Sequence, residues 1–266
     1  MYYRLASRHN SYMRLFDTHC HLDVEDFDAD RCEVLSAARA AGVERIAVPA
    51  IHRGNWQRVR DLCACEHGLF PALGLHPVYL LQHQENHLEE LAIEIDRQKP
   101  TAVGEIGLDF FIGDLDRDRQ KYFFQRQLDI ARNAQLPVLL HVRKAHDQVL
   151  QCLKRTRVVG GIAHAFNGSL QQAVQYIELG FKLGFGGTLT YEGSRHIREL
   201  ARQLPIESIV LETDAPDIVV AQHRGERNSP AYLPLCLGAL AQVRGASEET
   251  LAEATTRNAD EVFGLR

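Results

Sequence analysis

The sequence predicts a (β/α)8 barrel, an α/β fold of the TIM-barrel type, and three observations support this fold class. The chain has 266 residues, a usual length for one such barrel. Short apolar runs alternate with helical patterns along nearly the whole chain. Histidines and carboxylates follow several of these runs, where barrels of this type carry their chemistry. We expect one domain over residues 14–266, preceded by an extension at residues 1–13 that lacks clear periodicity, as a disordered segment would.

Eight short apolar runs are the candidate strands. They cover residues 14–17, 45–50, 69–75, 102–106, 137–142, 161–164, 181–185 and 209–212. Near-continuous apolar runs are what a parallel sheet buried on both faces requires. A doubly wound open sheet is the alternative fold, but no G-x-G-x-x-G motif follows the first run to favour a nucleotide-binding sheet.

The segments between the runs are predicted to be helical. Phe124, Leu128 and Ala131 have the i, i+4, i+7 spacing of one buried helix face. The last helix is expected over residues 248–262, with Ser247 as its N-cap. We find no composition break or internal repeat, which favours a single domain.

The composition is that of an ordinary globular protein, with 45% apolar and 24% charged residues. A formal net charge of -5 argues against a strongly basic protein that coats nucleic acid, but it allows a nuclease with a local basic rim. No apolar run of about 18 residues or more exists, so we expect no membrane association. No obligate protein partner is evident.

Six cysteines are scattered along the chain without a C-x-x-C pair. We interpret them as reduced thiols of a cytoplasmic enzyme rather than a disulfide framework. Cys63 and Cys65 lie in a predicted helix, where residues i and i+2 face apart, so they are not expected to share a metal. Residues 1–13 lack the apolar core of a secretory signal. Because Met13 stands directly before the first run, we hypothesise that it is the original start.

A His-x-His pair, His19 and His21, follows the first run. On an extended backbone the side chains at i and i+2 point to the same face, so the two imidazoles converge. Alone, the pair is better explained as two ordinary histidines at a strand end. Four further polar residues lie in or after other runs, and these are Glu105, His141, His164 and Asp214.

Each of these residues has an ordinary explanation: His141 as a core histidine, Glu105 as the partner of an arginine, Asp214 as a turn cap. A shared metal site explains all six, because such side chains are costly in apolar strands unless they are neutralised or coordinated. One ion needs only three or four protein ligands, so six candidates fit two ions about 3.5–4 Å apart with a bridging carboxylate. Glu105 is the expected bridge.

Several segments resemble the TatD-like metal-dependent hydrolases, also called TatD DNases, and in particular their YjjV-type branch. The segments are FDTHCH at 16–21, GEIGLD at 104–109, PVLLH at 137–141, HAFNG at 164–168 and ETDAP at 212–216. RGERNSP at 224–230 is similar to the family's Arg-Gly-x-x-Asn-x-Pro segment. The resemblance runs from about Leu15 to the C-terminus.

The resemblance implies an amidohydrolase-like TIM barrel with two divalent cations (zinc, manganese or magnesium). It implies hydrolysis of ester bonds, typically as a phosphodiesterase or deoxyribonuclease that uses a two-metal-activated water, with DNA or a small phosphoester as substrate. Carried over by position, one cation takes His19, His21, Glu105 and Asp214, and the other takes Glu105, His141 and His164. Asp217 and residues 218–222 depart from the family pattern, which puts substrate preference in doubt more than metal binding.

The expected catalytic residues are Asp214, Glu105 and His76. Asp214 would orient or deprotonate the attacking water, while Glu105 bridges the cations. His76 is a candidate phosphate contact or proton donor to the leaving group, and a turn histidine before Pro77 is the equal alternative.

Three arginines, Arg143, Arg224 and Arg227, are candidates for binding substrate phosphates, because the planar guanidinium matches phosphate in a bidentate manner. The alternative for each is a solvated charge at the rim. Asp17 and Asp109 are candidate acceptors for the outer nitrogens of the metal-binding histidines, with ordinary turn roles as the alternative.

Two rival functions remain open. The first is an amidohydrolase-type enzyme that cleaves a small amide, lactone or phosphoester on the same barrel, although a lysine on the fourth strand would have favoured it and Glu105 stands there. The second is a non-catalytic metal-binding scaffold, which would have no need of open coordination positions.

Overall fold

The computed structural model describes residues 13–265. Of the predicted extension at residues 1–13, only Met13 is therefore described, and it packs against the hydrophobic core. Residues 1–12 of that extension lie outside the described residues.

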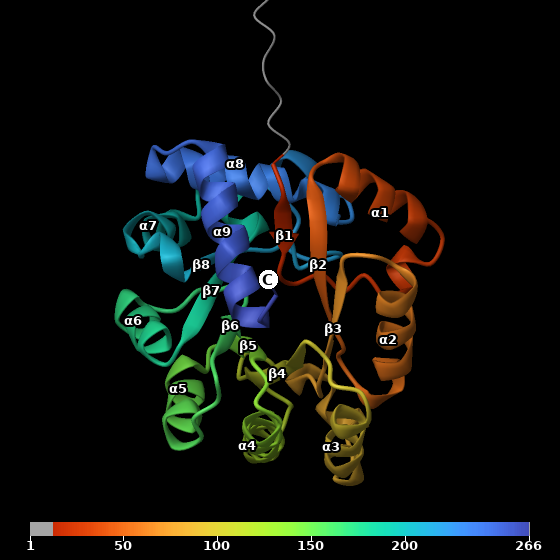
Figure 1. Cartoon of the computed structure of the whole chain (residues 1–266). Helices are drawn as coiled ribbons and strands as arrows, with labels where there is room; N and C mark the ends of the chain where they lie inside the picture. The colour runs from red at the N-terminus through yellow and green to blue at the C-terminus, as the bar shows by residue number, and fades with distance from the viewer. Residues whose placement is uncertain (1–12, 266) are drawn as a thin grey trace, which may run out of the picture.

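Eight parallel strands form a barrel in which each strand pairs with the next along the chain (Figure 1). The strands are β1 (Leu15–Asp17), β2 (Val43–Pro49), β3 (Leu69–Leu73), β4 (Ala102–Asp109), β5 (Val138–Arg143), β6 (Gly161–Ala163), β7 (Phe181–Phe185) and β8 (Ile209–Leu211). Thr18, directly after β1, joins the last strand to the first. Its backbone N–H and its hydroxyl both donate to the carbonyl of Leu211, each at 3.0 Å. The predicted fold class is confirmed.

Helices surround the barrel in an outer ring (Figure 1). The α-helices are α1 (Arg31–Ala40), α2 (Trp56–Cys65), α3 (Asn86–Arg97), α4 (Arg117–Ala134), α5 (His146–Arg155), α6 (Leu170–Glu178), α7 (Arg195–Gln203), α8 (Leu233–Arg244) and α9 (Glu248–Phe263). Short 3₁₀ turns are η1 (Glu25–Phe27), η2 (Arg53–Asn55), η3 (Pro77–Gln82), η4 (Gly187–Thr190), η5 (Ile206–Ser208), η6 (Ala221–His223) and η7 (Pro230–Tyr232). Within residues 13–265, no helix has the length and apolar character needed to cross a membrane.

Two helix predictions, the buried face of α4 and the N-cap of α9, are confirmed. Phe124, Leu128 and Ala131 of α4 are fully buried, as their spacing predicts. Burial of a large apolar side chain contributes about 1.5–3 kcal/mol, which fixes the face that α4 turns to the barrel. The side chain of Ser247 accepts a hydrogen bond from the N–H of Thr250, so the predicted N-cap of α9 is confirmed.

The last helix, α9, covers the end of the barrel at which the strands begin. The Phe263 ring of α9 lies 5.3 Å from the Phe16 ring of β1, measured between centroids. Both belong to an inner core with apolar side chains from the barrel strands, including Leu139 and Val210. This end is therefore filled with apolar side chains, and the polar residues that follow the strands gather at the other end.

Strand β4 is longer than its apolar run predicted, because it continues past Ile106 to Asp109. Gly107, Leu108 and Asp109 pair with residues 141–143 of β5, so backbone pairing holds them in the sheet. The extra length places the Asp109 side chain beside His141, with consequences for the site.

Candidate metal centre

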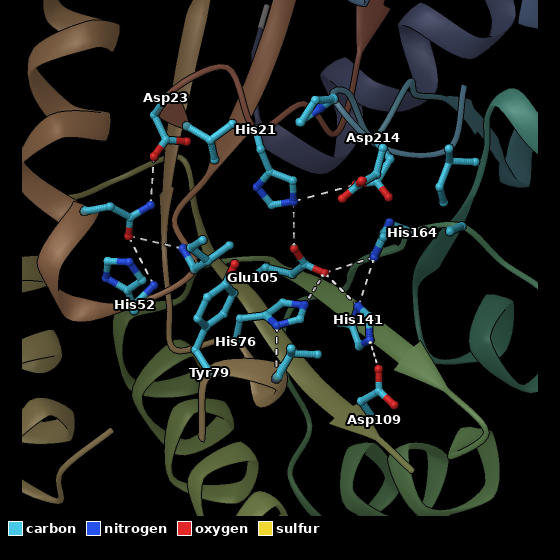
Figure 2. Close-up of a pocket in the computed structure, with 18 of the residues that line it drawn as sticks. His21, Asp23, His52, His76, Tyr79, Glu105, Asp109, His141, His164 and Asp214 are labelled. Atoms are coloured by element: carbon cyan, nitrogen blue, oxygen red, sulfur yellow. Dashed lines mark hydrogen bonds and ion pairs between the residues drawn. The ribbon is translucent and has the colours of Figure 1, made fainter. Parts of the chain in front are cut away.

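Glu105 of β4 lies among the polar side chains at the carboxyl end of the barrel and is 1% exposed. Its two carboxylate oxygens face different histidines (Figure 2). Oε2 lies 3.1 Å from Nε2 of His19 and 3.3 Å from Nε2 of His21. Oε1 lies 3.1 Å from Nδ1 of His141 and 2.9 Å from Nε2 of His164. One carboxylate thus stands between two pairs of imidazole nitrogens.

His19, His21 and Asp214 form the first group of donors. Oδ1 of Asp214 lies 3.6 Å from Nε2 of both histidines. The two segments are joined directly, because the N–H of Asp214 donates to the carbonyl of His19 at 2.8 Å. Nδ1 of His21 donates to the carbonyl of Pro49 at 3.2 Å, so Nε2 is the ring nitrogen that faces Glu105 and Asp214 and would be the one to bind a metal.

His141 and His164 form the second group. Nε2 of His141 donates to Oδ2 of Asp109 at 3.0 Å, so Nδ1 is the ring nitrogen that faces Glu105 and would be the one to bind a metal. The inner nitrogens of His141 and His164 lie 3.4 Å apart. Of the two aspartates considered as acceptors for histidine rings, Asp109 has that contact.

His76 is a third contact of the Glu105 carboxylate. Its Nδ1 accepts a hydrogen bond from the N–H of Val78 at 3.1 Å and so begins the η3 turn. Its proton therefore sits on Nε2, which donates to Oε1 of Glu105 at 3.2 Å. His76 therefore has the turn role that was one alternative for it, and it also lines the cavity; its role as a phosphate contact or proton donor stays a prediction.

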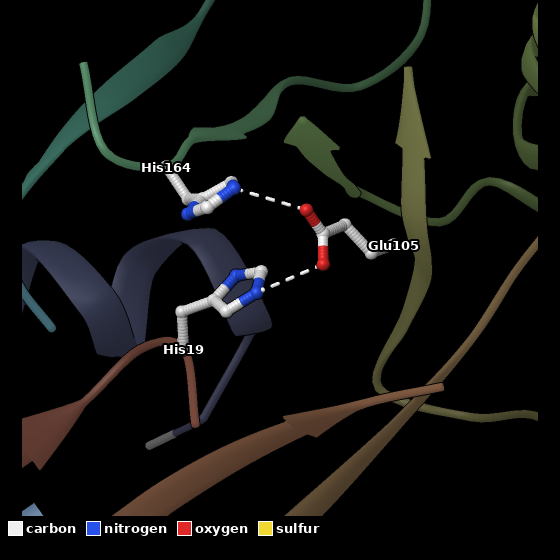
Figure 3. Close-up of side chains that lie close together, drawn as sticks. All are labelled: His19, Glu105 and His164. Carbon is white, nitrogen blue, oxygen red and sulfur yellow. Dashed lines mark hydrogen bonds and ion pairs between the residues drawn. The ribbon is translucent and has the colours of Figure 1, made fainter. Parts of the chain in front are cut away.

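The donor atoms fit divalent cations. Three groups of possible ligand atoms lie within 4.8 Å of one another, and they are His19–Glu105–His164, His19–His21–Asp214 and His76–Glu105–His141. His19 and His164 approach opposite oxygens of Glu105 (Figure 3). Imidazole nitrogen combined with carboxylate oxygen is the ligand chemistry that zinc and manganese accept.

The charges of the centre are strongly coupled. Burial raises the pKa of Glu105, but His76, His19 and His164 outweigh it and hold that pKa well below its usual range. Burial, together with the nearby His164, lowers the pKa of His19 to about 3. Burial also lowers the pKa of His76 to about 4, so the imidazoles of His19 and His76 are neutral at pH 7.

The pKa values of His21 and His164 shift in the opposite direction to those of His19 and His76. Burial lowers the pKa of His21, but Glu105 and then Asp214 outweigh it and raise the pKa to about 9. Burial likewise lowers the pKa of His164, and the same two carboxylates raise it to about 10. Both imidazoles are therefore protonated on both ring nitrogens, and so positively charged, at pH 7 in the metal-free protein.

Metal loading is consequently expected to release protons. A metal ligand must be neutral imidazole, so loading at pH 7 is expected to displace the extra ring protons of the candidate ligands His21 and His164. Because the protons compete with the metal below these pKa values, the apparent affinity should rise with pH up to about 9–10 and then level off. Calorimetric titration of metal-free protein with Zn²⁺, in two buffers of different ionisation enthalpy, measures this release. Equal heats in the two buffers would contradict it.

A family model described as TatD related DNase matches residues 16–264 of the chain. The chain belongs to the TatD family. It is 39% identical over 255 residues to the uncharacterized metal-dependent hydrolase YjjV of Escherichia coli K12, covering 95% of this chain and 98% of YjjV. A crystal structure of YjjV superposes with a TM-score of 0.91, covering 96% of this chain and all of that chain. Deoxyribonuclease TATDN3 of Homo sapiens is 32% identical over 262 residues, with 94% of each chain covered.

In this TatD-family chain Glu105, Asp214 and three of the four candidate histidine ligands line a cavity of about 940 Å³. Of the three arginines predicted to bind phosphates, Arg143 lines the cavity, whereas Arg224 and Arg227 are not among its lining residues. Arg227 donates to Oδ2 of Asp30 at 2.6 Å, and its guanidinium lies 4.5 Å from the Phe27 ring centroid. Arg227 is thus engaged by Asp30 and Phe27 outside the cavity lining, and its role in phosphate binding stays a prediction.

Two buried residues, Asp17 and Asn228, hold the loops that carry candidate ligands. Asp17 accepts hydrogen bonds from the N–H of His19 at 3.2 Å and from the N–H of Thr213 at 3.0 Å. Asp17 thus fixes the backbone after β1 and after β8. This is the turn role considered for it, rather than a hydrogen bond to a histidine ring. Nδ2 of Asn228 donates to the carbonyls of Thr213 and Asp217, at 2.8 and 2.7 Å, and so shapes the loop around Asp214.

Sequence reasoning missed Glu212, which is buried beside the site. Its Oε1 accepts a hydrogen bond from the N–H of Ala165, directly after His164, and lies 3.8 Å from Nδ1 of His164. A Cβ at position 184 would lie 2.0 Å from Oε2 of Glu212, so any residue other than glycine there would displace the Glu212 carboxylate. The signal available was a charged residue at the end of an apolar strand, two positions before Asp214.

Proposed function

We propose that the chain is a divalent-metal-dependent hydrolase of ester bonds that cleaves phosphodiester bonds in DNA. The observation that carries the proposal is the Glu105 carboxylate, whose two oxygens each face a separate pair of histidine nitrogens at 2.9–3.3 Å. A carboxylate shared by two donor groups is the arrangement that a two-metal hydrolytic centre requires.

Two cations would divide the ligands between them. His19, His21 and Asp214 would hold one, His141 and His164 would hold the other, and Glu105 would contribute one oxygen to each. When bound, the pair lowers the pKa of a water ligand and neutralises charge on the phosphoryl oxygens.

Asp214 is the proposed general base. Its carboxylate borders the cavity, and burial raises its pKa, which makes it a stronger proton acceptor than an exposed aspartate. The same group can return a proton to the leaving oxygen once the ester bond breaks. His76 carries its proton on Nε2 inside the cavity, so it is the proposed hydrogen-bond donor to a phosphoryl or leaving oxygen.

The substrate class rests on the family and on a named relative. The matching family is described as TatD related DNase, and the human relative is named a deoxyribonuclease. Arg143 is one of two arginines that line the cavity, and its guanidinium can pair with a phosphate; the other, Arg58, is paired with Asp28. These observations favour a phosphodiester over an amide or a lactone.

Metal removal tests the function. Protein treated with a chelator and dialysed should not cleave single-stranded DNA, and Mn²⁺, Zn²⁺ or Mg²⁺ added back should restore cleavage. The reloaded protein is assayed in parallel on a small amide and a lactone. Hydrolysis of either of these, without DNA cleavage, would favour the amidohydrolase-type function. Bound metal without any hydrolysis would favour the scaffold.

A further inference from the structure

An exposed aromatic side chain lies beside the cavity and has no role in the proposed centre. Phe111, in the loop after β4, is 51% exposed. The Arg143 guanidinium at the end of β5 lies 3.8 Å from the Phe111 ring centroid, and the ammonium of Lys144 lies 4.9 Å from it. Two cations and an exposed ring thus form one surface, which we call the Phe111 platform.

The platform is attached to the metal centre through Asp109. Oδ1 of Asp109 accepts hydrogen bonds from the N–H groups of Phe111 and Ile112, at 2.9 and 3.2 Å. Its other oxygen accepts the hydrogen bond from His141, as Figure 2 shows. The N–H of Phe110 also donates to the carbonyl of Arg143 at 2.9 Å, which ties the loop to β5. The loop is therefore held at a fixed place next to a proposed ligand.

The charge around the cavity is uneven. Neither Arg143 nor Lys144 forms an ion pair with any residue in the range 13–265. Arg143 also lines the cavity, as does Ile112, the residue after Phe111 in the loop that follows β4. Other parts of the lining are acidic, and these residues are Asp23, Glu25, Asp26 and Asp217. The cavity's remaining guanidinium, Arg58, is paired with Asp28. A polyanion that reaches the centre is therefore attracted along the Phe111 platform and repelled from the acidic lining.

We propose that the Phe111 platform binds the nucleotide next to the scissile phosphate of single-stranded DNA. An unpaired base stacks on the aromatic–guanidinium pair, while Lys144 and Arg143 contact the adjoining phosphates. A base in a duplex is covered by its neighbours and cannot make this contact, so the platform selects single-stranded substrate. The inference rests on the proposed cleavage of DNA and adds to it the strand form and the residues that recognise it.

The first test compares two substrates. Phe111→Ala should lower kcat/KM for a single-stranded oligodeoxynucleotide by about 5- to 150-fold, the effect of losing one base–aromatic stack. It should leave the hydrolysis of methyl 4-nitrophenyl phosphate, a diester without a base, within about twofold of wild type. Phe111→Trp should retain DNA cleavage. Ile93→Ala is the matched control, because Ile93 is 63% exposed on α3 and lies outside the cavity lining.

The second test measures binding apart from cleavage. An oligodeoxynucleotide carrying 2-aminopurine is titrated into metal-free protein, and its fluorescence should be quenched by wild type and by Ile93→Ala but not by Phe111→Ala. Arg143→Gln and Lys144→Gln should each reduce the slope of log K against log[salt] by about 0.7, one phosphate contact on a single strand.

The outcomes separate the two proposals. Quenching that depends on Phe111, without cleavage by the metal-loaded wild type, would refute the proposed function and leave the platform supported. Cleavage and quenching that are equal in wild type and Phe111→Ala would overturn the platform. Absence of quenching with wild-type protein would overturn it as well.

Discussion

Replacing Glu105 with glutamine is expected to lower metal-dependent turnover by about 10³-fold or more, because a shared metal ligand supports several kcal/mol of charge stabilisation in the transition state. The amide keeps one oxygen and presents an NH₂ group to the other side. Whichever way it is oriented, the NH₂ group faces one of the two histidine pairs, His19 with His21 or His141 with His164, and it offers no lone pair to a cation held there.

Metal analysis of the same variant separates a lost ligand from a lost fold. Glu105→Gln should bind fewer metal ions per chain than wild type, while its circular dichroism stays unchanged. Glu94→Gln is the control, because it makes the same substitution on α3, where Glu94 pairs with Arg97 at 2.7 Å outside the cavity. Full metal content and wild-type turnover in Glu105→Gln would refute the bridging role.

Asp214→Asn is expected to lower turnover by about 10²- to 10⁴-fold, the usual contribution of a general acid–base group. The backbone of Asp214 has φ 56°, in the left-handed region. Asparagine adopts that region as readily as aspartate, so the substitution removes the ionisable oxygen without disturbing the loop. The site formed by Glu105, His141 and His164 should still bind metal.

The kinetic signature distinguishes this variant from Glu105→Gln. For Asp214→Asn we expect kcat to fall while at least one metal ion per chain remains bound, measured by metal analysis on the sample used for kinetics. Asp217→Asn, the same substitution three residues later, lines the same cavity and should stay within about threefold of wild type. Turnover of Asp214→Asn at the rate of Asp217→Asn would exclude Asp214 as the base.

The sequence predicted more of the strands than of the contacts between them. Apolar runs located all eight strands, since burial of both sheet faces leaves a direct pattern in the residues. The apolar run of β4 ends at Ile106, because Gly107 and Asp109 carry no apolar signal, whereas the strand itself continues to Asp109. Those residues belong to the strand through backbone pairing with β5, a long-range interaction that no local pattern contains.

The same difference applies to the site. His19, His21, Glu105, His141, His164 and Asp214 were predicted as one group, because each is a polar residue at a strand position that otherwise favours apolar ones. Which ring nitrogen of a histidine faces Glu105 depends on the hydrogen-bond partner of the other nitrogen. These partners are Pro49 for His21, Val78 for His76 and Asp109 for His141, and they take up their places only in the folded chain. Glu212 was missed for the related reason that its hydrogen-bond partner follows a different strand.

The sequence by itself determined the fold class, the family and the set of candidate ligands, since these depend on residue type and spacing. Only the tertiary structure decided that each oxygen of Glu105 faces its own histidine pair and that Phe111 lies against Arg143. The pairing of β4 with β5 and the hydrogen bond from the N–H of Phe110 to the carbonyl of Arg143, both formed between residues far apart in the chain, set those positions. A one-dimensional pattern records which side chains are present, but their mutual geometry is a property of the closed barrel.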